Sequence, residues 1–78
     1  MPTVFQDGPY DFIFFSSDVG EPPHIHVKRD RKVAKFWLTP VAFVKNLGFK
    51  NHELNQIERR VIQHQTRLLE DWNDYFGS

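Results

Sequence analysis

The stretch that most constrains the fold is a double proline followed by two alternating segments. Residues 24–29 read His-Ile-His-Val-Lys-Arg and come directly after the prolines at 22–23. Proline fixes φ and cannot donate to a sheet, so the pair introduces a strand at a set angle. Residues 33–38 also alternate, and a charged turn at 30–31 separates the two segments. The two segments are therefore predicted to form an antiparallel pair of strands.

A tight turn between these strands predicts their register. The cross-strand pairs are then Val27 with Ala34, Ile25 with Phe36, His26 with Lys35, and His24 with Trp37. One face of the pair is apolar and consists of Ile25, Val27, Ala34, Phe36 and Leu38. The opposite face carries His24, His26, Lys28, Lys35 and Trp37. A slip of one residue changes the partners but keeps both histidines on one face.

The segments before the double proline also favour strands. Residues 3–6 predict a short edge strand, although Pro9 behind the turn at 7–8 argues against a tight hairpin. Residues 10–17 contain a run of apolar residues on both faces, typical of a central strand covered on two sides. A polar loop is expected from 16 to 21.

Helices are predicted for the rest of the chain. Thr39 and Pro40 resemble an N-cap and first helical residue, and Gly48 is a natural stop, which predicts a short helix between them. Asn51 is expected to cap a long helix. Its apolar stripe has helical spacing and consists of Leu54, Ile57, Val61, Leu68, Trp72 and Tyr75, widened by Ile62, Leu69 and Phe76.

The predicted fold is a single α+β domain over residues 1–78. A small antiparallel sheet of three or four strands is followed by a short and a long C-terminal helix, packed on the Ile25 and Phe36 face. The histidine face is expected to stay open. At this length the core is small, so a homodimer or a complex would be a natural way to cover more surface.

Composition limits the classes of site. The chain has no cysteine, which excludes disulfides and thiolate metal sites and leaves His, Asp and Glu as the strong ligands. No leader and no apolar run of the roughly 18 residues of a membrane span are present, so we expect a cytoplasmic protein without membrane contact. We name no cofactor.

The zero net charge hides a polarised arrangement. Residues 1–27 carry four acids and no Lys or Arg, residues 28–50 carry seven bases against Asp30, and residues 51–78 carry three bases against five acids. A cationic middle third can attract an acidic partner or nucleic acid. It can equally be a solvated face that pairs with the acidic ends of the chain.

Several motifs together resemble one family of small bacterial proteins, domain of unknown function 4160 (DUF4160). They are residues 1–4, 22–27, 34–38, Pro40, 69–72 and 75–77. The resemblance implies a compact α+β domain, often encoded beside a small protein of another family, domain of unknown function 2442. It also implies that the two proteins form a toxin–antitoxin-type pair, and it leaves open which of the two is the toxin.

The two histidines support three hypotheses. The first is a metal site to which both histidines contribute a ligand. Residues i and i+2 of a strand point to the same side of the sheet, with their Cα atoms about 7 Å apart. The third ligand that such a site needs has no fixed place. The candidates are Asp18, Glu21, Glu58 and His64. Lysines on the same face oppose a cation, and an amphipathic strand with no ligand is the simplest interpretation of the motif.

The second hypothesis is a metal-independent ribonuclease. His24 and His26 would act as base and acid, and Lys35 would stabilise the charged phosphorane. The third hypothesis is an interaction protein that uses Lys28, Arg29 and Trp37 to bind a partner protein or RNA. We rank binding above catalysis, because the near-neutral chain lacks the positive charge that holds RNA, but the sequence leaves open whether the protein is an enzyme.

Two further histidines are expected to be structural or solvated. His64 lies at the edge of the helical stripe, where a histidine is more often a hydrogen-bonded core residue than a ligand. His52 lies in the first turn of the predicted helix and is expected to face solvent. Trp37 is the ambiguous aromatic, because an exposed tryptophan beside cations indicates an interface.

Overall fold

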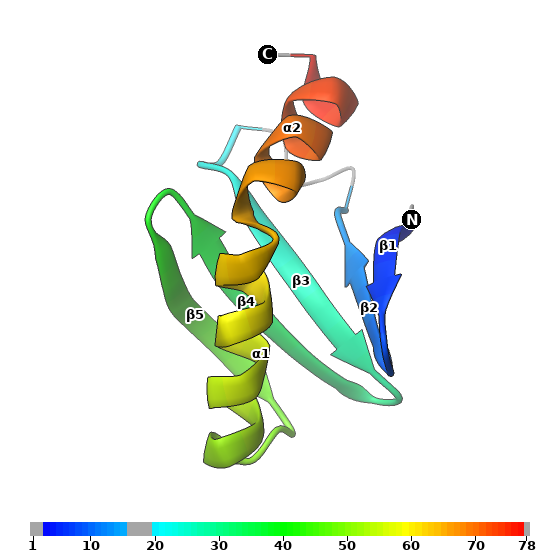
Figure 1. The fold of residues 1–78 in the computed structure, drawn as a ribbon, viewed down its shortest axis with the longest axis vertical. Helices are drawn as coiled ribbons and strands as arrows, with labels where there is room; N and C mark the ends of the chain where they lie inside the picture. The colour runs from blue at the N-terminus through cyan, green and yellow to red at the C-terminus, as the bar shows by residue number, and fades with distance from the viewer. Residues whose placement is uncertain (1–2, 16–19, 78) are drawn as a thin grey trace.

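The computed structural model describes residues 3–15 and 20–77 and contains one five-stranded sheet and two helices (Figure 1). The elements in chain order are β1 (Thr3–Asp7), β2 (Tyr10–Ile13), β3 (His24–Arg29), β4 (Lys32–Leu38), β5 (Val41–Leu47), α1 (Asn51–Gln63) and α2 (Gln65–Phe76). Every strand pairs with its sequence neighbour in antiparallel fashion, in the order β1-β2-β3-β4-β5. The α+β class and the C-terminal position of the helices are confirmed. The sheet has one or two strands more than predicted.

The register predicted for the central pair is confirmed in β3 and β4. Val27 lies opposite Ala34, Ile25 opposite Phe36, His26 opposite Lys35, and His24 opposite Trp37. The double proline also ties the start of β3 to the end of β4. The Pro23 carbonyl accepts a hydrogen bond of 3.0 Å from the Leu38 amide.

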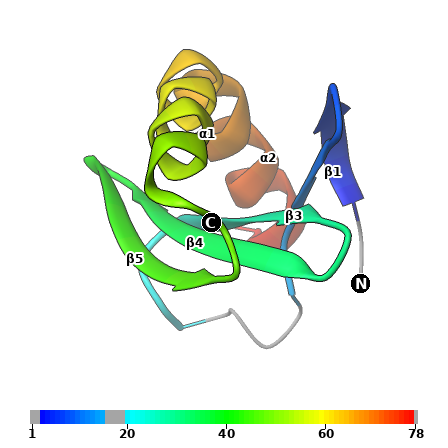
Figure 2. The same cartoon turned by 90° about the horizontal axis from the view of Figure 1, so that it is seen from below.

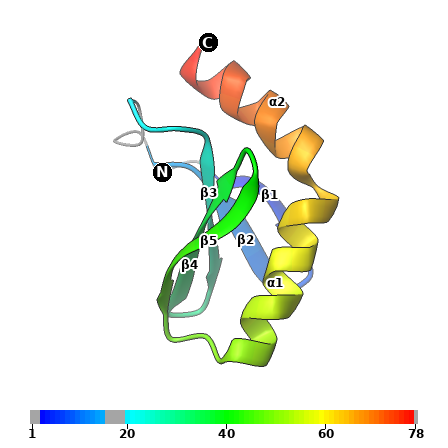
Figure 3. The same ribbon diagram turned by 90° about the vertical axis from the view of Figure 1, so that its left-hand side faces the viewer.

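The core lies between one face of the sheet and the two helices (Figure 3). This inner face is the predicted apolar face, extended by β2 and closed by α1 and α2. The buried residues of this core, from the sheet, the helices and the segments beside them, are Tyr10, Phe12, Phe14, Ile25, Val27, Ala34, Phe36, Leu38, Phe49, Ile57, Val61, Leu68 and Trp72. Figure 2 shows the sheet curving around the helices, with β1 and β5 at its two edges. Within the described residues, both helices fall short of the length and apolar character that a bilayer-spanning helix requires.

The short helix predicted between Pro40 and Gly48 is wrong, because this segment is the edge strand β5. Thr39 and Pro40, joined by a cis peptide bond, form the turn between β4 and β5. Val41, Phe43 and Val44 favour a strand, and pairing with β4 outweighs a helix signal that a turn shares. Phe43 and Leu47, which lie in the segment predicted as a helix, are 51% and 55% exposed.

The N-terminal hairpin is also tighter than predicted. Asp7 pairs directly with Tyr10, so Gly8 and Pro9 form a two-residue turn. Gly8 has φ of +59°, the left-handed conformation that glycine adopts without steric cost. β2 ends at Ile13, and residues 16–17 of the predicted strand lie outside the described residues.

The predicted long helix is divided into α1 and α2 at His64. The backbone of His64 leaves the helical region, with φ of −101° and ψ of 10°, and its amide still donates to the Arg60 carbonyl at 3.0 Å. The apolar stripe is confirmed at Ile57, Val61, Leu68 and Trp72. Ile62 and Tyr75, also assigned to that stripe, are exposed.

Candidate functional site

The sheet face that points away from the helices, called here the outer face, carries most of the predicted site residues. The cross-strand pairs place these side chains on one side of the sheet, since opposite residues share a face. The outer face consists of Asp11, Ile13, Phe15, His24, His26, Lys28, Val33, Lys35, Trp37, Lys45 and Leu47. Only part of it is open to solvent.

A hollow of about 400 Å³ lies in this outer face. Its lining is Phe15, His26, Val33, Lys35, Lys45 and Leu47. Three of these side chains are apolar and three carry nitrogen, so the hollow offers an apolar floor beside cationic groups. This composition fits a ligand that has an apolar part next to an acidic part.

Two lysines lie side by side in the lining of the hollow. Lys35 on β4 and Lys45 on β5 are direct cross-strand partners, a position in which like charges repel. Lys35 donates a hydrogen bond of 3.0 Å to Glu21, and its ammonium lies 5.0 Å from the centre of the Trp37 ring. The Lys45 side chain is exposed, and no ion pair to it is found among residues 3–15 and 20–77. A carboxylate placed between the two lysines would relieve this repulsion.

The two histidines of the motif have different environments. His26 lines the hollow, where Phe15 packs edge-on against its ring with 4.4 Å between centroids. His24 is 0% exposed, which corrects the expectation that both imidazoles stay open. The reason is Trp72 of α2, whose ring lies 5.1 Å from the His24 ring.

His24 is also held by the double proline that precedes it. Its Nδ1 lies 2.9 Å from the Pro22 carbonyl oxygen, which can only accept, so Nδ1 carries the proton in this contact. The rings of His26 and Trp37 pack edge-on against it at 5.1 and 5.8 Å. The buried His24 ring is therefore part of the packing at the end of the sheet.

Arg29 is separated from the other predicted binding residues. Its guanidinium donates to Glu53 of α1 at 2.9 Å, on the side of the sheet that the helices cover. Glu53 also accepts a hydrogen bond of 2.8 Å from the Tyr10 hydroxyl. The Tyr10 and Arg29 hydrogen bonds lower the pKa of Glu53, and burial together with Glu53 raises the pKa of Tyr10.

The candidate third metal ligands do not gather around the histidines. Asp18 lies outside the described residues, Glu21 pairs with Lys35, and His64 lies on the inner side against Asp7. Glu58 lines a separate groove between α1 and β5. Within residues 3–15 and 20–77, no group of three or more His, Cys, Asp or Glu is arranged to hold a metal ion.

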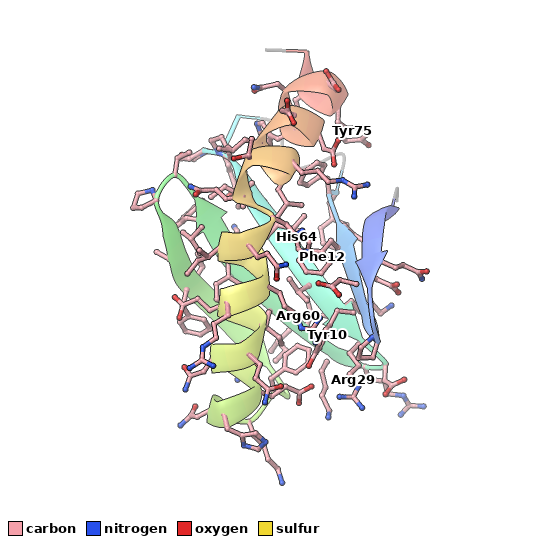
Figure 4. The ribbon with its side chains drawn as sticks, viewed as in Figure 1. Tyr10, Phe12, Arg29, Arg60, His64 and Tyr75 are labelled. Carbon is pink, nitrogen blue, oxygen red and sulfur yellow. The ribbon has the colours of Figure 1, made fainter. Side chains whose placement is uncertain are left out.

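A polar clasp on the inner side was not predicted from the sequence (Figure 4). Asp7 at the end of β1 accepts hydrogen bonds from Arg60 at 2.7 Å and from His64 Nε2 at 2.9 Å. The His64 hydrogen bond, with help from Arg60, lowers the pKa of Asp7. Arg60 also stacks over the Tyr10 ring at 5.2 Å. These contacts fasten the N-terminal hairpin to the helices.

Comparison with family models decides the relationship of the chain. The model of DUF4160, a domain of unknown function, matches residues 10–73. The chain belongs to the DUF4160 family. The matched DUF4160 region runs from the start of β2 to the last turns of α2 and includes the hollow and both histidines of the motif. Searches of curated proteins and of solved structures found no match.

Proposed function

We propose that this DUF4160 chain is an interaction protein whose outer face binds an acidic polypeptide. The observation that carries this proposal is the Lys35–Lys45 pair, two like charges held opposite each other beside an apolar hollow. The fold supplies no carboxylate to Lys45 among the described residues. A partner that brings an acid removes the repulsion and gains two cationic contacts.

The apolar part of the hollow indicates what accompanies the acid. Val33 and Leu47 pair across the strands next to the two lysines, and Leu47 is 55% exposed. An aliphatic or aromatic side chain from a partner would bury this surface. A segment with one apolar side chain beside a carboxylate therefore matches the lining of the hollow in polarity and charge.

The family context supports a protein as the partner. The resemblance to the family implies a small protein encoded beside its members, and on this proposal that protein occupies the outer face. On this proposal the chain is the interaction component of a toxin–antitoxin-type pair. RNA is favoured less, because the aromatic side chain of the hollow, Phe15, packs against His26, and its cations are lysines rather than the arginines that stack on bases.

The ribonuclease hypothesis, with His24, His26 and Lys35 as its catalytic groups, has weaker support. A general acid or base has to reach the proton that it transfers. His26 lies at the hollow and satisfies this condition. His24 is 0% exposed, behind Trp37 and Trp72, so a substrate would have to displace part of the core to reach it.

Binding of a defined acidic polypeptide tests the proposal. The probe is a random copolymer of glutamate and tyrosine, added at low ionic strength to the ¹⁵N-labelled protein. We expect amide shift changes to centre on Lys35, Lys45 and Leu47. Lys45→Glu should weaken binding at least about tenfold, since it replaces an attraction with a repulsion. Arg59→Glu makes the same charge change on the exposed surface of α1 and should leave binding within about twofold.

Three outcomes would contradict the proposal. The first is equal binding by wild type and Lys45→Glu. The second is an equal loss in Lys45→Glu and Arg59→Glu, which would indicate attraction by overall charge alone. The third is preferential binding of polyuridylate over the acidic copolymer at the same face, which would favour RNA.

A further inference from the structure

The C-terminal end of α2 carries exposed acids that the described fold does not neutralise. Glu70 and Asp74 are exposed and lie four residues apart, so they share one stripe of the helix. Neither forms an ion pair among residues 3–15 and 20–77, and the last turn of α2 holds no base. Acids at a helix C-terminus also oppose the helix dipole, so this end favours a cationic neighbour.

The same end of α2 also presents an aromatic ring. Tyr75 (Figure 4) is 42% exposed and follows Asp74 in the chain. One side of its ring packs against Phe76 at 4.7 Å between centroids. Figure 3 shows α2 crossing the end of the sheet, and the side chains of Glu70, Asp74 and Tyr75 in this part of the helix are exposed. The end of α2 therefore combines a carboxylate and an apolar ring in one accessible segment, the combination that the hollow requires.

The residues of this end do not line the hollow of their own chain. The last turns of α2 are held against the core, since the Trp72 ring lies 5.2 Å from the Phe14 ring and 5.1 Å from the His24 ring. The lining of the hollow comes instead from Phe15 and from strands β3, β4 and β5. With α2 held in this packing, the acidic end and the cationic hollow meet only between two copies of the chain.

We propose that the outer face binds the α2 end of a second copy of this chain. The inference rests on the proposed function, because it names an occupant for that same face. Asp74 would lie between Lys35 and Lys45, and Tyr75 would cover the apolar floor beside Leu47. If the contact is made twice about a two-fold axis, each copy gives one α2 end and receives one, and the assembly closes as a dimer.

This arrangement has a consequence for partner binding. The second copy and any acidic partner use the same hollow, so they exclude each other. Raising the concentration of the protein should weaken its apparent affinity for the glutamate–tyrosine copolymer, because the dimer has to dissociate first.

Charge exchange tests the inference by sedimentation equilibrium. Wild type should self-associate, and higher salt should weaken the association. Lys45→Glu and Asp74→Lys should each weaken it at least about tenfold, since each change puts like charges together in the contact. An equimolar mixture of the two variants should associate again, because each contact then joins a lysine to a carboxylate. Arg59→Glu is the matched control and should associate like wild type.

Unfolding of the single variants separates association from folding. Both positions are exposed, and Asp74→Lys replaces an acid with a base at a helix C-terminus, so it should stabilise the monomer slightly while it weakens the dimer.

A wild-type monomer across the whole concentration range would overturn the inference, as would a dimer that neither variant weakens. Copolymer binding that depends on Lys45 would still uphold the proposed function in either case. If copolymer binding also does not depend on Lys45, both the inference and the proposed function are contradicted.

Discussion

Replacement of His24 by alanine should destabilise the protein far more than the same change at His26. His24 is fully buried and contacts three other rings, whereas His26 is only partly buried at the hollow. Truncating a buried side chain of this size to alanine costs about 2–5 kcal/mol. The lost hydrogen bond to the Pro22 carbonyl adds about 1 kcal/mol. We expect a loss of about 3 kcal/mol for His24→Ala and less than about 1 kcal/mol for His26→Ala.

Urea unfolding followed by tryptophan fluorescence measures this difference. A domain of this size has a slope of about 1 kcal/mol per molar urea, so the His24→Ala midpoint should fall by about 3 M. That loss is a large part of a total stability of about 4–12 kcal/mol. His26→Ala should keep nearly the wild-type midpoint and lose copolymer binding instead. Equal midpoints for the two variants would refute the assignment of His24 to the core.

Two further substitutions test the clasp and the turn before α1. Asp7→Asn removes a charge-assisted contact to His64 and should cost about 1–2 kcal/mol at neutral pH. Because the pKa of Asp7 is lowered in the folded protein, its contribution to stability is complete above its unfolded pKa of about 4 and is lost as the pH falls through the folded pKa. Asp7→Asn should therefore make stability depend less on pH in the acid range. An unchanged pH dependence in that range would contradict the clasp. Gly48→Ala should destabilise more than Gly20→Ala in the same urea assay. Both glycines have positive φ, but only a Cβ at Gly48 would lie 3.0 Å from Lys32 Cγ; equal effects would mean that the contact is irrelevant.

Local alternation was sufficient to predict β3, β4 and their pairing. Alternate residues of a strand face opposite sides, so a charged turn between two alternating segments leaves few registers that keep the apolar residues together. Ile25 and Phe36 were placed correctly on this basis. The segment after Thr39 was assigned wrongly to a helix. A proline that begins a helix and a proline in a turn have the same local sequence, and only the pairing with β4 distinguishes the two.

The features that the sequence did not predict depend on contacts between distant parts of the chain. Alternation places His24 on the outer face but does not show that Trp72, 48 residues later, closes over it. The clasp joins Asp7 to Arg60 and His64, and no spacing in the sequence relates these positions. The sequence signal for the clasp is an acidic residue, Asp7, in the turn after the first predicted strand. The Lys35–Lys45 pair was missed for another reason, because Lys45 had been assigned to a helix.

The most direct measurement of the central proposal is a nuclear Overhauser experiment with the glutamate–tyrosine copolymer bound to methyl-labelled protein. The hollow places the methyl groups of Val33 and Leu47 beside the lysine pair. We predict magnetisation transfer from the tyrosine rings of the copolymer to these methyl groups, and its loss in Lys45→Glu. Transfer instead to Ile62, which is exposed on α1, or to no methyl group, would contradict binding at the outer face.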